Sequence, residues 1–147
     1  MSNGSPIIEF SDLQSRMDFD FIYNFLTNSY WSEGISQGRM LRAMENSINI
    51  GAFIAEKQVA YSRIVTDKAT FAYLCDVFVS PLVRGQSISK NMMEYILSLN
   101  SLQGIKRFSL CTKDAHGLYA QFGWKPLNDP EMYMEINRSG IYKLLKE

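Results

Sequence analysis

The sequence has little of what marks metal centres, disulfide frameworks and membrane spans. Its 147 residues include two cysteines, Cys75 and Cys111, and one histidine. Both cysteines lie in apolar, strand-like runs without a CxxC pattern or a histidine cluster, so we expect buried, reduced thiols and no metal site. No run approaches the roughly 18 apolar residues of a membrane helix, and the opening residues lack the pattern of a signal peptide. These absences predict a cytoplasmic protein with no membrane partner.

A net charge is also missing. Lysine and arginine together number 15, as do aspartate and glutamate. This balance gives the chain no general attraction to nucleic acid, so we expect no nucleic-acid partner. Hydrophobic residues make up 46% of the chain and charged residues 20%, which is typical of a folded domain and not of a disordered one. The length and the absence of linkers and repeats predict one domain that spans residues 1–147.

The first half of the chain combines helical and β-like periodicity. Apolar side chains at helical spacing predict amphipathic helices, and β-rich runs joined by short turns predict an antiparallel meander. Ser36 is the expected N-cap of the second helix, and Lys57-Gln58 is the expected turn of a hairpin. The expected elements are a strand at residues 7–10, helices at 17–28 and 36–46, and strands at 48–56, 59–66 and 70–79.

The second half of the chain predicts a β-α-β unit. Pro81 follows the strand at 70–79, and an apolar stripe then predicts a helix that leads into another strand. A crossover of this kind joins parallel strands and is right-handed. The expected elements are a helix at 87–99, a strand at 107–112, a helix at 115–122 capped by Gly123, and a last strand at 131–137. The predicted fold class is α/β, a mixed sheet in which an antiparallel meander joins a β-α-β unit with flanking helices.

The turn before the helix at 87–99 has the residue types of an anion site. The first N–H groups of a helix lack internal acceptors and, together with the helix dipole, favour an anion. Gly85 lets the backbone come close to a ligand, and Arg84 supplies a permanent positive charge. Ser87 and Ser89 add hydroxyl donors. These residue types alone are also typical of an ordinary helix start with a serine N-cap.

Two segments of the chain resemble the GNAT N-acetyltransferase family. Residues 76–90, DVFVSPLVRGQSISK, are similar to its acetyl-CoA-binding segment, a strand followed by Arg/Gln-x-x-Gly-x-Gly/Ala at the start of a helix. Arg84 matches the first position of that pattern, and Ser87 and Ser89 stand where the family has small glycine-type residues. Residues 114–124, DAHGLYAQFGW, are similar to the family's Leu-Tyr-x-x-Phe-Gly-Phe segment. The order of the expected elements resembles the family over nearly the whole chain.

This resemblance implies transfer of an acetyl group from acetyl-CoA to a primary amine of a small molecule. It implies that the strand offers backbone groups to the pantetheine arm and that the turn binds the pyrophosphate. Whether the serine Cβ atoms of the turn narrow the space for the phosphates is left open. The residues implied at the cofactor are Val77, Phe78 and Val79 in the strand, and Arg84, Gly85, Gln86, Ser87, Ile88 and Ser89 in the turn.

The reaction requires an acid for the departing thiolate and a base for the amine proton. The resemblance places Tyr119 near the thioester sulfur as the acid; the alternative is a core tyrosine. Asp76 is the candidate base, because a lone carboxylate in an apolar strand requires an explanation. The alternative is a structural pair with an arginine such as Arg63. His116 and water remain further candidates for the base.

The acceptor pocket is the least defined part of the prediction. Tyr30, Trp31 and Tyr73 are candidates to line it, since aromatic walls suit a small amine with an apolar body. Plain core packing is the alternative for each. Two other functions stay open: a non-catalytic module that binds CoA or a metabolite, and acetylation of a protein or peptide amine. Residues 132–136 offer an edge strand or an apolar face for a homodimer.

Overall fold

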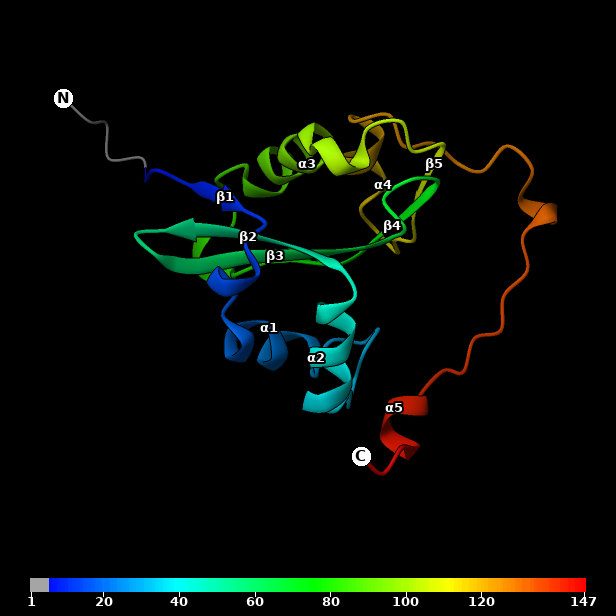
Figure 1. Cartoon of the computed structure of the whole chain (residues 1–147), viewed down its shortest axis with the longest axis horizontal. Coiled ribbons are helices and arrows are strands. Elements are labelled where there is room, and N and C mark those ends of the chain that lie inside the picture. The colour runs from blue at the N-terminus through cyan, green and yellow to red at the C-terminus, as the bar shows by residue number, and fades with distance from the viewer. Residues whose placement is uncertain (1–5) are drawn as a thin grey trace.

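The computed structural model describes residues 6–147 and contains a mixed β-sheet with helices on both faces (Figure 1). The strands are β1 (Glu9–Ser11), β2 (Ile48–Ile54), β3 (Lys57–Thr66), β4 (Phe71–Val79) and β5 (Arg107–Leu110). They lie in the sheet in sequence order. The first four are antiparallel and β5 runs parallel to β4, which confirms the predicted meander, the β-α-β unit and the α/β fold class.

One face of the sheet carries the first two helices, α1 (Phe19–Leu26) and α2 (Gln37–Glu45) (Figure 1). Each helix begins at a side-chain cap. Asp18 accepts a hydrogen bond from the N–H of Phe21, and Ser36 accepts one from the N–H of Arg39, as predicted. A core of buried apolar side chains joins these helices to the sheet; its members are Ile22, Leu26, Ile35, Met40, Met44, Tyr61 and Phe78.

The opposite face of the sheet carries α3 (Ile88–Ser98) and α4 (His116–Ala120) (Figure 1). The apolar stripe predicted for α3 is buried, with Ile88, Met92, Met93 and Ile96 each at most 2% exposed. These side chains pack on Ile50, Ile64 and Leu74 of the sheet. Short 3-10 turns join the elements at Gln14–Arg16, Pro81–Val83, Asn100–Leu102 and Pro130–Met132. Within residues 6–147, no helix combines the length and the hydropathy of a membrane span.

Strand β4 contains a bulge at Asp76. The residue has a φ of +56°, and the register between β3 and β4 shifts there, so that Arg63 pairs with Cys75 but Tyr61 pairs with Phe78. The bulge reverses the faces of the strand. Leu74, before it, lies in the core with α3, whereas Phe78, after it, lies in the core with α1 and α2. Strand β4 therefore contributes to both layers of the molecule.

The predicted hairpin turn at Lys57-Gln58 is wrong by two residues. The turn lies at Ala55 and Glu56, which have φ values of +48° and +70°, and Ile54 pairs with Lys57. Both turn residues are in the left-handed region, as in the turns that match the twist of a hairpin. Gln58 lies within β3, where its buried side chain donates to the carbonyl of Ala60 at 3.0 Å.

The predicted last strand at 131–137 is also wrong for the single chain. Among residues 6–147 this segment pairs with no strand of the sheet. It belongs to residues 125–140, a stretch that is exposed throughout, that contains the 3-10 turn Pro130–Met132, and that we call the C-terminal arm (Figure 1). The arm leads to α5 (Ile141–Leu144), which is held beside α2. There Glu147 pairs with Arg39, and Lys143 pairs with Glu33 at 2.8 Å. With its far end fixed on that side, the arm leaves the sheet instead of extending it.

Candidate functional site

The sheet opens between β4 and β5. Their parallel pairing ends at Leu74 and Leu110, so the rest of β4 pairs with no strand on that side in the part of the chain that the structure describes. In an antiparallel ladder, successive residues direct their backbone groups to opposite sides. The pairing of Phe78 with Tyr61 and the bond from Ser80 N–H to Val59 direct the groups of Val77 and Val79 toward the opening.

Of the three strand residues predicted at the cofactor, two therefore face the opening. The carbonyl of Val79 accepts a hydrogen bond from Arg84 Nε at 3.3 Å, which agrees with this orientation. Phe78 differs, because its backbone faces β3 and its ring stacks on Phe25 at a centroid distance of 3.9 Å. The open edge thus presents Val77 and Val79.

The turn between β4 and α3 gathers unpaired donors. No backbone N–H from Arg84 to Lys90 donates to an acceptor within residues 6–147, and the first turn of α3 contains no acidic residue. Gly85 and Ser87 have φ values of +87° and +58°, and this conformation turns successive N–H groups in one direction. A cavity of about 250 Å³ lies beside the turn, between Val79 and Leu118. These residues can bind an anion of phosphate type.

The backbone conformation explains the glycine that the family pattern has at position 87. Ser87 is in the left-handed region, which glycine adopts without steric cost, and its side chain does not cap the helix. Ser89 lies in the first turn of α3 and is not among the residues with positive φ. The two serines therefore differ: only Ser87 carries backbone strain.

Tyr119 lies in α4 and is 7% exposed. Its ring packs edge-on against Trp124 at a centroid distance of 5.7 Å, as the core alternative predicted. The residue also borders a second cavity, of about 890 Å³, together with His116 and the whole of β5. Burial, and to a lesser degree the nearby Asp114 carboxylate, raises the pKa of the phenol. Tyr119 is therefore a core residue that keeps its proton at neutral pH.

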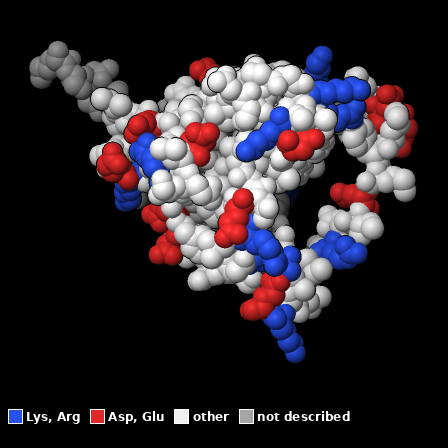
Figure 2. All heavy atoms as spheres, in the orientation of Figure 1, with Lys and Arg blue, Asp and Glu red and all other residues white. Residues whose placement is uncertain are grey.

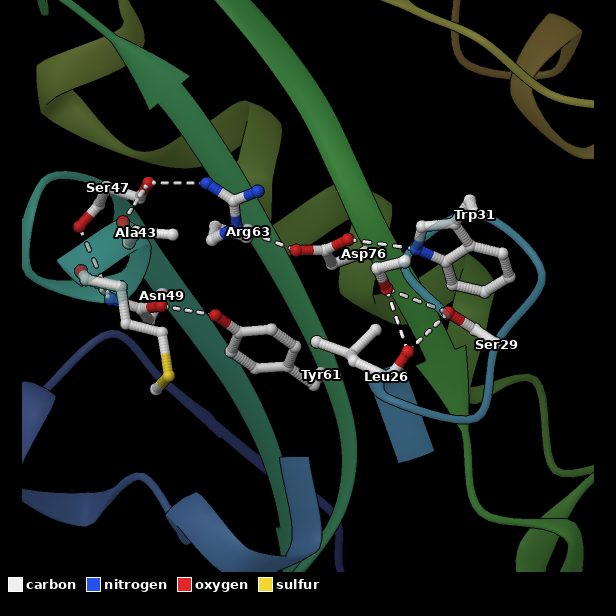
Figure 3. A network of polar contacts seen from close by, with 11 residues as sticks. Leu26, Ser29, Trp31, Ala43, Ser47, Asn49, Tyr61, Arg63 and Asp76 are labelled. Carbon is white, nitrogen blue, oxygen red and sulfur yellow. Dashed lines mark hydrogen bonds and ion pairs between the residues drawn. The ribbon is translucent and has the colours of Figure 1, made fainter. Parts of the chain in front are cut away.

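Asp76 is buried at the bulge and both of its oxygens are engaged (Figure 3). Oδ1 accepts from Trp31 Nε1 at 2.9 Å, and Oδ2 accepts from Arg63 Nε at 2.7 Å. Arg63 also donates to Ser47 Oγ at 3.0 Å, which links β3 to the end of α2. The pair with Arg63 is the structural alternative left open above. A role for Asp76 as a base stays a prediction.

Two of the three aromatic residues predicted for the acceptor lie at this network. Trp31 is held by Asp76, and Tyr30 packs edge-on against it at 5.1 Å. Lys113 Nζ lies 5.2 Å from the centre of the Tyr30 ring, a contact that no sequence pattern indicated. Tyr73 lies in β4; burial, and then the neighbouring Cys111, raises the pKa of its phenol. Tyr30 and Trp31 are brought together, and within residues 6–147 no ring stacking or hydrogen bond joins them to Tyr73.

The expectation of two buried thiols is wrong for Cys111 and only partly right for Cys75. Both cysteines are free, and Cys75 is half-buried in β4, where burial raises the pKa of its thiol to about 12. Cys111 is exposed, because β5 ends at Leu110 and the chain leaves the sheet there. Within residues 6–147 no group of three His, Cys, Asp or Glu side chains is placed to hold a metal ion.

Comparisons with known proteins agree with this geometry. Residues 48–126 match the acetyltransferase (GNAT) domain family. A solved structure from Xanthomonas campestris pv. campestris, described as belonging to the GNAT family, is 41% identical in sequence. The alignment covers 95% of this chain and 99% of that one, with a TM-score of 0.91. No curated protein matches the chain.

More distant solved structures share the fold alone. One is an acetyltransferase from Clostridium acetobutylicum solved with acetyl-CoA, with 14% identity, coverage of 89% of this chain and 96% of that one, and a TM-score of 0.65. Another is glucosamine-6-phosphate N-acetyltransferase from Arabidopsis thaliana, with 13% identity, coverage of 90% and 97%, and a TM-score of 0.63.

The strain at Ser87 gives a test of the turn. Ser87→Gly is expected to raise the free energy of unfolding by about 0.5–1 kcal/mol, since it removes a left-handed penalty of about 1–2 kcal/mol and adds some unfolded-state entropy. Ser89→Gly is the matched control and is expected to lower it by about 0.5 kcal/mol, because glycine disfavours a helix. Urea unfolding followed by circular dichroism measures both. A Ser87→Gly variant less stable than the parent would contradict the assignment of strain.

Proposed function

Because the chain belongs to the GNAT acetyltransferase family, we propose that it transfers the acetyl group of acetyl-CoA to a primary amine of a small molecule. The observation that carries this proposal is the row of free N–H groups from Arg84 to Lys90 beside the open edge of β4. This arrangement offers an anion site and a strand edge in one continuous surface. A molecule with a pyrophosphate and an amide-containing arm fits both parts.

The turn and the strand divide the binding of acetyl-CoA between them. The N–H groups of residues 84–90 bind the pyrophosphate, and the Arg84 guanidinium adds a positive charge. Val77 and Val79 present backbone groups to the amides of the pantetheine arm, as a neighbouring strand would. This places the thioester toward the bulge at Asp76.

The chemistry then requires two proton transfers. The acceptor nitrogen forms a bond to the thioester carbonyl carbon, and the carbon–sulfur bond breaks. Tyr119 donates its phenolic proton to the departing thiolate, a role that its raised pKa permits because the phenol stays protonated. The phenolate regains a proton from solvent, and water takes the proton that the amine loses.

Asp76 acts in this proposal as a positioning residue. Its two oxygens hold Trp31 and Arg63, so it fixes the loop that carries Tyr30 and Trp31 beside the opening. Tyr30 and Trp31 line one part of the proposed acceptor site and Tyr73 on β4 another, and their rings suit the apolar body of the amine. Lys113 beside Tyr30 adds a positive charge to the first of these parts, which favours acceptors that do not themselves carry a second cation there.

Calorimetric titration with acetyl-CoA tests the proposed function directly. Binding is expected at micromolar concentrations, and Arg84→Ala is expected to weaken it about 10–150-fold, since a hydrogen bond to a charged group contributes about 1.5–3 kcal/mol. Arg138→Ala, an exposed arginine on the arm, is the matched control. Absence of binding at high micromolar acetyl-CoA would contradict the proposal. Binding without turnover across a panel of amines would instead support a non-catalytic module.

The role of Tyr119 gives a second prediction. Tyr119→Phe is expected to lower kcat by about 100-fold or more, the usual contribution of a positioned acid, and to leave the affinity for acetyl-CoA unchanged. Tyr95→Phe on α3, whose hydroxyl hydrogen-bonds Asp12, is the control and should keep full turnover. Steady-state kinetics and calorimetry give the two quantities. An unchanged kcat in Tyr119→Phe would show that Tyr119 is not the general acid.

Asp76→Asn separates positioning from base catalysis. If Asp76 positions the aromatic residues, Asp76→Asn is expected to raise the KM for the amine. The value of kcat and the shape of its pH profile should then change little. A base would instead show a loss of kcat of at least about 100-fold and the loss of the acidic limb of the profile. Asp67→Asn, in the turn between β3 and β4, is the matched control. The second result would show that Asp76 acts as the base and would contradict the positioning role.

A further inference from the structure

The loop that follows α1 presents two aromatic rings to solvent. Tyr30 is 68% exposed and Trp31 is 41% exposed, and the two rings meet edge-on at a centroid distance of 5.1 Å. The serines on either side of them are buried, and Ser29 and Ser32 both donate to the carbonyl of Leu26, at 2.7 and 2.8 Å. The loop is thus fixed by its serines and leaves its aromatic rings free to contact a ligand.

The charged side chains beside this loop form ion pairs. Asp76 on β4 pairs with Arg63 at 2.7 Å, and Glu33 in the loop pairs with Lys143 at 2.8 Å. The chain has no net charge, and the two signs are interspersed over the face that Figure 2 shows. A ligand at the loop is therefore attracted or repelled chiefly by the nearest unpaired charge, because more distant charges are screened and largely cancel.

Lys113, in the segment that follows β5, supplies that charge. Its Nζ lies 5.2 Å from the centre of the Tyr30 ring, a position that a cation–π contact favours. Among residues 6–147, no carboxylate oxygen lies within 4.0 Å of this nitrogen. The adjacent Asp114 carboxylate interacts with the Tyr119 phenol and forms no ion pair with Lys113. The Lys113 side chain is exposed, so its ammonium group can bind an anion.

A series of contacts leads from Asp76 to this ammonium group. Asp76 Oδ1 accepts a hydrogen bond from Trp31 Nε1 at 2.9 Å (Figure 3). The Trp31 ring then meets the Tyr30 ring, which in turn contacts Lys113. In the proposed reaction the thioester and the attacking amine lie toward the bulge at Asp76, so two aromatic rings separate that amine from the cation. An acceptor that contacts both needs a polar group at each end and an apolar body between them.

We propose that the acceptor is a small amine with a carboxylate at the far end of its apolar body, and that Lys113 binds this carboxylate. The single positive charge of the ammonium group matches the single negative charge of a carboxylate, and its N–H groups donate to the carboxylate oxygens. The inference rests on the proposed acetyl transfer, which fixes the direction of the amine. Lys113 determines specificity in this arrangement and takes no part in the proton transfers.

Two amines that differ only at the far end test this specificity. They are 4-(aminomethyl)benzoate and 4-(aminomethyl)benzamide, which share the reacting amine and the ring. The kcat/KM of the parent is expected to be about 5-fold higher for the benzoate, the upper range for an exposed ion pair. Lys113→Ala is expected to remove this preference and Lys113→Glu to reverse it. A parent that uses both amines equally, or a preference that survives Lys113→Ala, would overturn the proposal.

Two controls accompany these measurements. Lys57→Ala changes an exposed lysine at the start of β3 and should keep the full preference for the benzoate. Added salt should reduce the preference of the parent toward that of Lys113→Ala, because it screens an exposed ion pair. A preference that is equal at low and high salt would show that the benzoate is selected by its shape and not by its charge, and this result would contradict the role of Lys113.

Binding of the acetylated products separates this inference from the proposed function, because it requires no turnover. Calorimetric titration is expected to show about 5-fold tighter binding of 4-(acetamidomethyl)benzoate than of the matching benzamide, and equal binding in Lys113→Ala. If this preference is found but neither amine is acetylated, the acetyl transfer is contradicted and the carboxylate site is supported. If both amines are acetylated equally well and both products bind equally, the acetyl transfer is supported and the carboxylate site is refuted.

Discussion

The bulge at Asp76 is the constraint on which the two helix layers and the opening between β4 and β5 depend. A left-handed residue within β4 turns the strand over, so that Leu74 faces α3 and Phe78 faces α1 and α2. The parallel pairing with β5 ends two residues before it. A non-glycine residue pays about 1 kcal/mol for this conformation. The ion pair with Arg63 and the hydrogen bond from Trp31 hold it, because leaving either oxygen of a buried carboxylate unpaired would be more unfavourable.

The same contacts connect the helix layer to the open edge. Through Asp76, the loop that follows α1 is fixed to β4, and through Arg63 and Ser47 the end of α2 is fixed to β3. The turn that follows β4 begins only a few residues beyond the bulge, and α3 follows it directly. The position of the donor row in residues 84–90 therefore depends on a local distortion that is itself stabilised by residues from distant parts of the chain.

Periodicity predicted the elements but could not predict the bulge. Along β4 the buried positions Ala72, Leu74, Asp76 and Phe78 alternate without a break, so a strand that reverses its face at residue 76 has the pattern of one that does not. The turn at Ala55 and Glu56 was missed because neither residue is typical of left-handed turns.

In the site, the donor turn could be predicted since its residues are adjacent in sequence. The contact of Lys113 with Tyr30 could not, because it joins a loop after α1 to one after β5. The alternation at 131–137 predicts a strand, but the contacts of Glu147 and Lys143 hold the end of the arm beside α2, a tertiary constraint that alternation does not carry.

The two tryptophans lie in different parts of the molecule and in different electrostatic surroundings. Trp31 donates its indole N–H to the Asp76 carboxylate and is 41% exposed, whereas Trp124 donates to the Phe108 carbonyl of β5 at 3.0 Å and is more enclosed. The Asp76 carboxylate beside the Trp31 indole carries a full negative charge, whereas the Phe108 carbonyl beside the Trp124 indole is a neutral dipole. The two rings are therefore expected to differ in their fluorescence emission. The protein thus carries one intrinsic optical label at the bulge of β4 and another beside β5, and the surroundings of each can be followed without any added dye.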